Sequence, residues 1–376
     1  MPKEDIQRDE LLSSLVSTAE YEIFTYPHWT FIFRLKNLVK KLTKKILKKT
    51  PIVNDRLNWP IGIMVRGLIE INDTKPLIKY ANSWANHGAK FYNIDDALAA
   101  EVFIYLYRKT AGEGYKMAAD EMYQYLVESR KDAEGSLLYR PNQDNEIVAV
   151  DMIGLVAPFL VKYGTEFKVP EAIELAYTQI KNYLIHGMDE KTGLPVHAYE
   201  AATGSHYGLV GWGRAVGWLM MGMSFFIKYV CDEAEKLTEE MQKDFSEYND
   251  IRTAFNSLKK NVLKYIGEDG LFSWHITEID GHVDTSASGM ILDAMAMTVG
   301  FGEKKYSDGV EDDAILNKGI SALKEKVVDG TVTDALGECE DYGVHPQYYG
   351  AFPWALGPTM MLLSRVDSVS TSSCDG

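Results

Sequence analysis

The sequence contains few cysteines and no long apolar run, and its acidic residues outnumber its basic ones. Its 376 residues include three cysteines, Cys231, Cys339 and Cys374, which lie far apart and form no CxxC pair. Neither a disulfide framework nor a zinc site is therefore expected. No window approaches eighteen uncharged apolar residues, and the first residues lack the apolar stretch of a secretory signal. We therefore expect a soluble protein of the reducing cytoplasm without a transmembrane segment.

The charge balance and the missing motifs exclude several classes of protein. Lys and Arg total 39 against 54 Asp and Glu, a net charge of −15, so a nucleic-acid partner is not expected. The eight histidines show no HExxH or comparable spacing, and neither a GxSxG elbow nor a GxxxxGK[ST] loop occurs. A metal centre, a Ser or Cys hydrolase, a P-loop enzyme and a Rossmann dehydrogenase are all disfavoured, and no cofactor is expected.

What the sequence has in quantity is helical periodicity, with apolar residues three and four apart in most long segments. Glycine turns end at residues 135, 193, 270 and 330, and the apolar helices that follow them begin near residues 151, 212, 285 and 350. A helix that is apolar nearly all round must be buried on every side. Its alternation with amphipathic helices therefore predicts two concentric layers, an (α/α)6 barrel. An α-solenoid or an irregular helical bundle is the alternative.

No Pro/Gly/Ser-rich linker divides the chain, so we expect one all-α barrel domain over residues 57–367. Residues 1–56 are expected to form a helical extension and residues 368–376 a disordered tail. Within the extension, residues 29–49 carry eight Lys or Arg and no acidic residue, with an apolar stripe on one helical face. Such a helix can lie on an anionic membrane. The simpler interpretation is an outer helix whose charged face is solvated.

Carboxylates stand at the starts of two apolar segments. Asp151 lies in a run, residues 148–160, that is otherwise entirely apolar or glycine and proline. A carboxyl buried without partners tends to have a raised pKa, and such an acid suits general-acid chemistry at neutral pH. A helix cap is the alternative role. Asp95 and Asp96 lead into the apolar helix of residues 92–103, where capping by one of them is the simpler interpretation.

A third segment, residues 208–223, combines tryptophan, arginine and glycine. Trp212 and Trp218 could form a flat apolar wall for a sugar ring, or could belong to the core. Arg214 could pair with a structural carboxylate or face a ligand carboxylate, for which its planar fork is suited. His186 and His197 lie in the stretch before this segment, close enough in sequence to line the same opening.

Taken in order, these segments resemble glycoside hydrolase family 105, the unsaturated rhamnogalacturonyl hydrolases. The resemblance is carried by Asp151 with the apolar run ending in PFL, by the HG-x-D segment at 186–189 and by WGRAVGW at 212–218. Three further segments fit in order: IDDALAAEVFIYLYRKTAGEGY at 94–115, DTSASGMILDAMA at 284–296 and YYGAFPWALGPTMMLLSR at 348–365. The resemblance extends from about residue 57 to residue 366.

The resemblance implies an (α/α)6 barrel that releases a 4,5-unsaturated uronic acid from the non-reducing end of a small pectin-derived oligosaccharide. Asp151 would protonate C4 of the double bond, and its carboxylate would then activate the water that adds at C5. Asp95 would be the second carboxylate, close enough to raise the pKa of Asp151. By position, the resemblance assigns sugar binding to Arg214, Trp212, Trp218, His186, His197 and Ser286.

Three alternatives keep the barrel. An unsaturated glucuronyl hydrolase of family 88 would act on glycosaminoglycan fragments. A sugar epimerase would need two histidines at matching inner-helix positions, which the sequence does not offer. A non-catalytic carbohydrate-binding protein would use Asp151 only as a cap. Whether Asp95 or Asp96 is the second carboxylate stays open, and a homo-oligomer is compatible with the sequence.

Overall fold

The structure, a computed structural model, describes most of the chain in six stretches: residues 3–28, 57–85, 91–139, 145–232, 245–299 and 310–371, with residues 35, 39 and 43 in addition. Apart from those three residues, the basic stretch 29–49 lies outside the described residues, as do residues 372–376 of the expected tail. Among the described helices, none combines the length and the apolar character that a bilayer-spanning segment requires.

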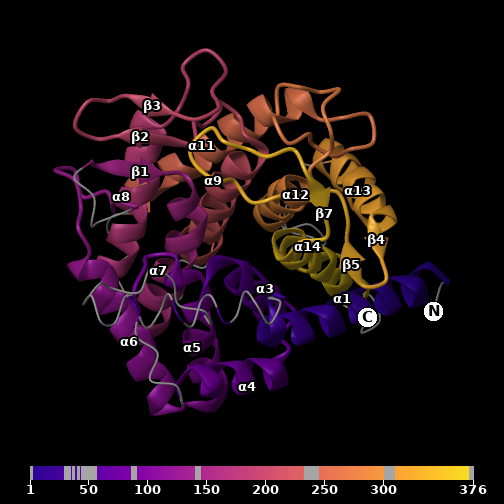
Figure 1. Ribbon diagram of the computed structural model, residues 1–376, viewed down its shortest axis with the longest axis horizontal. Helices are drawn as coiled ribbons and strands as arrows, with labels where there is room; N and C mark the ends of the chain where they lie inside the picture. The colour runs from indigo at the N-terminus through magenta and orange to yellow at the C-terminus, as the bar shows by residue number, and fades with distance from the viewer. Residues whose placement is uncertain are drawn as a thin grey trace.

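The described residues form twelve α-helices in two concentric rings (Figure 1). The inner ring consists of α3 (Trp59–Glu70), α5 (Asp96–Thr110), α7 (Asp151–Phe167), α9 (Gly213–Phe226), α12 (Thr285–Val299) and α14 (Pro353–Thr371). Each inner helix packs against the next, and α14 closes the ring on α3. The outer helices are α1 (Lys3–Thr25), α4 (Thr74–Ala85), α6 (Glu113–Glu128), α8 (Pro170–His186), α11 (Phe245–Val262) and α13 (Val310–Glu325). The predicted (α/α)6 barrel, a single domain, is confirmed.

Helix α1 lies within residues 1–56, which the sequence set apart as an extension. It packs against α14, α3 and α4, and its side chains Leu15, Ala19 and Ile23 are buried in the core. It therefore supplies the sixth outer helix. At the other end of the chain, α14 continues to Thr371, four residues into the segment expected to be a disordered tail.

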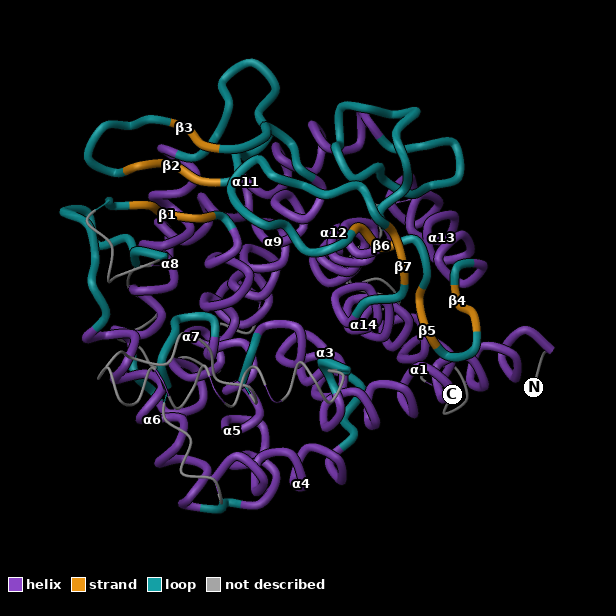
Figure 2. The backbone as a smooth tube through the Cα atoms, in the orientation of Figure 1, coloured by secondary structure: helices purple, strands orange, loops and turns teal. Residues whose placement is uncertain are grey.

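Short strands and two irregular helical turns complete the described fold (Figure 2). An antiparallel sheet joins β1 (Ile147–Ala149), β2 (Ala198–Glu200) and β3 (His206–Tyr207); two hairpin pairs join β4 (Val327–Val328) to β5 (Thr331–Val332) and β6 (Ala335–Leu336) to β7 (Tyr349–Gly350). A π-helix, η1 (Ile227–Asp232), extends α9, and a 3-10 turn, η3 (Leu263–Tyr265), follows α11. The strands lie in the connections at one end of the barrel.

The sequence pattern locates the inner helices closely. All four turn glycines have positive φ, between 66° and 89°, a conformation that glycine adopts without a Cβ penalty. The predicted starts of the apolar helices near 151, 212, 285 and 350 compare with observed starts at 151, 213, 285 and 353. In α7 every residue from 152 to 164 is buried, as a helix enclosed by neighbours requires.

Close approach of α7 and α9 depends on glycine. A Cβ added at Gly154 would lie 2.5 Å from Cε3 of Trp218 and 2.7 Å from its carbonyl oxygen. A Cβ added at Gly222 would lie 2.5 Å from the carbonyl oxygen of Ile153. Because backbone cannot move aside as a flexible side chain can, both positions fix the spacing of these two helices. Trp218 is thereby held at the position from which it lines the cavity described below.

Charged side chains form a buried network inside the ring. The Arg66 guanidinium pairs with Glu101 and donates to the carbonyl oxygen of Gly154 at 2.8 Å. The ammonium of Lys162 lies 2.8 Å from Glu101 and 3.1 Å from Glu70. Burial alone would raise the pKa of Glu70, but the charges of Lys162 and Arg365 lower it to about 2. The network thus compensates charges that would otherwise be costly to bury.

We expect Gly154→Ala to destabilise the protein by about 1–3 kcal/mol, because the added methyl group overpacks the contact between α7 and Trp218. Urea denaturation followed by circular dichroism measures the change. Gly114→Ala is the matched control: Gly114 also lies in a helix, but a Cβ there meets no atom within 4 Å. That variant should gain up to about 1 kcal/mol from helix propensity. Equal effects of the two substitutions would contradict the packing argument.

Candidate active site

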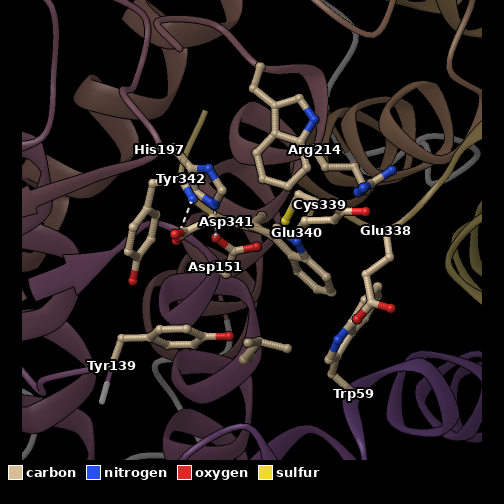
Figure 3. A pocket seen from close by; sticks show the side chains of 13 residues that line it. Trp59, Tyr139, Asp151, His197, Arg214, Glu338, Cys339, Glu340, Asp341 and Tyr342 are labelled. Carbon is tan, nitrogen blue, oxygen red and sulfur yellow. Dashed lines mark hydrogen bonds and ion pairs between the residues drawn. The ribbon is translucent and has the colours of Figure 1, made fainter. Parts of the chain in front are cut away.

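The starts of three inner helices, α3, α7 and α9, border one cavity (Figure 3). It holds about 640 Å³ of empty space, counting its open mouth. Its lining residues are Trp59, Tyr139, Asp151, Leu155, His197, Trp212, Arg214, Trp218, Glu338, Cys339, Glu340, Asp341 and Tyr342. Because helix N-termini carry unpaired N–H groups and partial positive charge, this end of the barrel favours an anionic ligand.

Asp151 and His197 form the polar floor of the cavity. Asp151 is the first residue of α7, and the preceding N-cap residue makes no side-chain capping bond. The amide of Val150 donates to the carbonyl oxygen of His197 at 3.0 Å, beside the β1–β2 pairing, so the short sheet brings the histidine to the helix start. Nε2 of His197 lies 3.2 Å from Oδ2 of Asp151, whose side chain is 18% exposed against 4% for the histidine. Asp151 therefore faces the opening with a partner on one side.

Arg214 lines the cavity and is held by structural partners. Its Nη1 and Nη2 donate to the carbonyl oxygens of Leu336 and Gly337 at 2.8 and 2.7 Å. Its Nη1 also lies 3.6 Å from Oδ2 of Asp284, a fully buried carboxylate. The guanidinium carbon sits 4.8 Å from the ring centroid of Trp212, a cation–π arrangement. Arg214 therefore pairs with a structural carboxylate while lining the cavity, and its role toward a ligand carboxylate stays a prediction.

Ser286 does not line the cavity, contrary to the assignment made from the sequence. Its side chain is fully buried, and its hydroxyl donates to Oδ1 of Asp284 at 2.5 Å. The same Asp284 oxygen accepts the amide of Leu336 at 3.1 Å. Ser286 therefore lies beneath the surface of the cavity. Its hydroxyl orients the carboxylate of Asp284, which lies beside Arg214.

His186 is likewise absent from the lining of the cavity, and its role in sugar binding stays a prediction. It is the last residue of outer helix α8, and its Nε2 lies 2.8 Å from a carboxylate oxygen of Glu134. Its side chain is 37% exposed. His186 still lies beside the sheet: its ring centroid is 5.6 Å from that of Tyr199, and its carbonyl oxygen is 2.8 Å from Nε2 of His206.

Three tryptophans form an aromatic wall. Trp212 and Trp218, both predicted, are joined by Trp59, which begins α3. The rings of Trp59 and Trp218 meet edge to face at 6.2 Å. Trp212 and Trp218 are almost fully buried, so they border the cavity while also belonging to the core. Flat apolar surfaces of this kind suit the face of a sugar ring.

The two aspartates before α5 have different environments. Asp96 is buried, and its Oδ2 accepts the amides of Tyr92 and Asn93 at 2.8 and 3.3 Å. Burial raises the pKa of Asp96 to about 7, although these two hydrogen bonds oppose the rise. Asp95 occupies the N-cap position without making a side-chain capping bond. Neither carboxylate lines the cavity, so Asp96 serves the fold of this turn.

Tyr139 connects Asp95 with the cavity. The negative charge of Asp95, burial and the charge of Asp151 together hold the pKa of Tyr139 well above its usual value. The phenol therefore stays protonated, and it lines the cavity together with Asp151. Tyr139 lies in the connection before β1, a segment in which no residue pattern pointed to a function.

Sequence reasoning also missed Trp59 and the loop of residues 338–342. That loop follows β6 and enters the cavity from a part of the chain far from Asp151. His345, further along the same connection, stacks on His197 at a ring distance of 5.7 Å and contacts Trp212 at 4.6 Å. Burial, with help from the neighbouring charges, lowers the pKa of His345 to about 4, so its ring is neutral at pH 7. The acidic run Glu-Cys-Glu-Asp was the available signal for the loop.

Comparison with known proteins identifies the class. The sequence model described as Glycosyl Hydrolase Family 88 matches residues 36–368. A structure described as a possible member of family GH105 from Salmonella enterica serovar Paratyphi A has a TM-score of 0.76 at 16% identity, with 97% of this chain and 95% of that chain covered. One with the same description from Klebsiella pneumoniae has a TM-score of 0.72 at 15% identity and 82% coverage of both chains.

An unsaturated glucuronyl hydrolase from Bacillus sp. GL1, described as responsible for the degradation of glycosaminoglycan, has a TM-score of 0.64 at 14% identity. It covers 85% of this chain and 88% of its own. These likenesses show a shared barrel fold, and the class defined by fold and site is the (α/α)6-barrel glycoside hydrolases. The chain belongs to Glycosyl Hydrolase Family 88, and the predicted GH105-like resemblance is confirmed.

We expect the stability of the protein to fall as pH rises from about 4 to about 7, in part because Asp96 must ionise while buried. Its folded pKa of about 7 exceeds its ordinary value of 3.8, so in this window the folded state binds more protons than the unfolded state. Asp96→Asn keeps an acceptor for the two amides and should flatten this slope by a few kcal/mol across the window. Denaturation at several pH values measures it.

Asp280→Asn, in an exposed loop, is the matched control and should leave the slope unchanged. An equal slope in the wild type and in Asp96→Asn would contradict the assignment of this proton to Asp96.

Proposed function

We propose that the protein hydrates the C4–C5 double bond of an unsaturated uronic acid at the non-reducing end of short rhamnogalacturonan-derived oligosaccharides and thereby releases that sugar. Family membership and fold support the broader class, an unsaturated uronyl glycoside hydrolase. The observation that carries the proposal is the position of Asp151, on the floor of a cavity of sugar size with His197 at 3.2 Å.

The proposed chemistry uses one carboxyl group twice. Asp151 in its acid form gives its proton to C4, which leaves oxocarbenium character at C5. The resulting carboxylate accepts a proton from the water that attacks C5, so the acid is regenerated. The hemiketal formed at C5 then collapses, opens the ring and releases the aglycone. No displacement at the anomeric carbon occurs, so the carboxylate separation that distinguishes retaining from inverting enzymes does not apply.

Several side chains near Asp151 would support its proposed role as the acid. His197 restrains one oxygen of Asp151 and leaves the carboxyl facing the cavity. Arg214 lines the cavity, and its positive charge would attract the uronate carboxylate while Nη1 and Nη2 stay bonded to backbone carbonyls. Trp59 is only partly buried and offers a face for ring stacking, whereas Trp218 is 2% exposed. Asp95 is the proposed second carboxylate, and it influences the site through Tyr139.

The choice of a rhamnogalacturonan-derived substrate rests on the sequence resemblance to family 105, in particular the segment WGRAVGW and the aspartate followed by PFL. The alternative substrate is a glycosaminoglycan fragment, on which the Bacillus sp. GL1 relative acts. A cytoplasmic location for the reaction stays a prediction.

Replacing Asp151 by Asn should abolish turnover by orders of magnitude, because the amide has the size of the acid but cannot donate the proton to C4. The assay is the loss of ultraviolet absorbance of the conjugated double bond in an unsaturated disaccharide. Asp280→Asn removes an exposed carboxylate elsewhere and should keep full activity. A non-catalytic binding protein would show no turnover in either variant or in the wild type, and its sugar affinity would survive Asp151→Asn.

Lyase-generated rhamnogalacturonan and chondroitin disaccharides, assayed side by side under the same conditions, separate the two substrate classes. The proposal expects a higher kcat/KM on the rhamnogalacturonan product. Preference for the chondroitin product would replace the proposed substrate with the glycosaminoglycan alternative and leave the proposed chemistry standing.

A further inference from the structure

One wall of the cavity is acidic. Five consecutive residues, 338–342, line it, and three of them are carboxylates: Glu338, Glu340 and Asp341. Figure 3 shows these side chains around the same space as Asp151. This is an unexpected lining for an enzyme whose proposed substrate is itself an anion, because like charges repel.

The acidic wall is fixed in place by its backbone. The start of the loop is anchored by the two hydrogen bonds from Arg214 to the carbonyl oxygens of residues 336 and 337. Within the loop, the amide of Glu340 donates to the carbonyl oxygen of Val344 at 3.1 Å, and the amide of Val344 donates to the backbone carbonyl oxygen of Asp341 at 2.9 Å. The amide of Tyr342 donates to the Asp341 carboxylate at 2.8 Å. A ligand therefore meets these carboxylates at defined positions.

Among the lining residues, carboxylates outnumber the positively charged side chains. Four carboxylates face a single guanidinium, that of Arg214, whose Nη1 and Nη2 are already engaged with backbone carbonyls. Burial raises the pKa of the Cys339 thiol to about 12, so this residue adds no negative charge. Glu338 accepts a hydrogen bond from Trp59 and is held against the aromatic wall. Glu340 and Asp341 are exposed, and the side chain of Glu340 has no hydrogen-bond partner among the described residues.

The positive charge of Arg214 and of the helix starts at the cavity would attract the single carboxylate of the unsaturated uronate. A second anionic group on the adjoining sugar would find no further Lys or Arg among the lining residues and would share the cavity with Glu340 and Asp341. We propose that Glu340 and Asp341 make the enzyme selective for an uncharged aglycone, so that an unsaturated uronide linked to a sulfated sugar is rejected. This inference rests on the proposed function, because it concerns the sugar attached to the unsaturated uronate.

Two unsaturated disaccharides that differ only in one sulfate group on the reducing-end sugar test the inference. The unaltered enzyme should show a kcat/KM at least about tenfold higher on the unsulfated compound. Raising the salt concentration from about 0.05 to 0.5 M should narrow this ratio, because exposed charges are screened over a few ångströms at high salt.

The isosteric variants Glu340→Gln and Asp341→Asn, alone and combined, separate charge from shape. The combined variant should reduce the ratio several-fold by raising kcat/KM on the sulfated compound. Asp280→Asn removes one negative charge, as each single variant does, but lies outside the cavity, so its ratio should match that of the unaltered enzyme. A ratio that is unchanged in the combined variant overturns the inference, as does equal activity on the two compounds.

Failure of the proposed function gives a different result. If neither disaccharide is hydrated, their binding to the unaltered enzyme is measured by calorimetry. If the unsulfated compound binds more tightly, and the combined variant brings the two affinities closer by tightening binding of the sulfated compound, the acidic wall is supported as a selectivity device while the hydratase proposal fails. Equal affinity for the two compounds, or no binding of either, overturns the selectivity inference as well.

Discussion

Arg214 joins the first turn of α9 to the loop that follows β6, and the shape of the cavity depends on this connection. Its guanidinium is almost fully buried and would be costly to enclose without partners. Two backbone carbonyls and the carboxylate of Asp284 supply those partners. Through them, one side chain holds residues 336 and 337 beside a helix more than a hundred positions earlier in the chain. The loop wall and the helical floor of the cavity are therefore set in register by a single cation.

The barrel provides the second condition for the site. The starts of α3, α7 and α9 border one opening and bring partial positive charge to a chain whose net charge is −15. Asp151 stands at one of these starts, so its side chain lies in the field of a helix N-terminus. Close helix contacts, such as that between Gly154 and Trp218, keep this arrangement rigid. A substrate carboxylate arriving near Arg214 would experience the same field.

The sequence predicted the parts of the site that a local pattern can reveal. An aspartate in an apolar run and an arginine between tryptophans stand out because each breaks a buried pattern, and the structure brings Asp151, His197, Trp212, Arg214 and Trp218 to one cavity. Ser286 and His186 do not line this cavity, and sequence spacing cannot tell a cavity surface from the layer beneath it or from an outer-helix end. Trp59, Tyr139 and residues 338–342 reach the site only through the closure of the ring. No local pattern encodes that closure.

In the proposed enzyme, the acid and the acidic wall stand on different kinds of structure. The proposed acid, Asp151, stands on an inner helix whose every side is packed, so its position follows from the core. The acidic wall stands on a loop, held by its ends and by a few backbone hydrogen bonds. Substitutions in such a loop disturb the core little, whereas a change in the helix would be felt throughout the ring. The proposed reaction and the proposed choice of aglycone thus belong to parts of the molecule under different physical constraints, so a substitution in the loop could alter the aglycone without altering the chemistry.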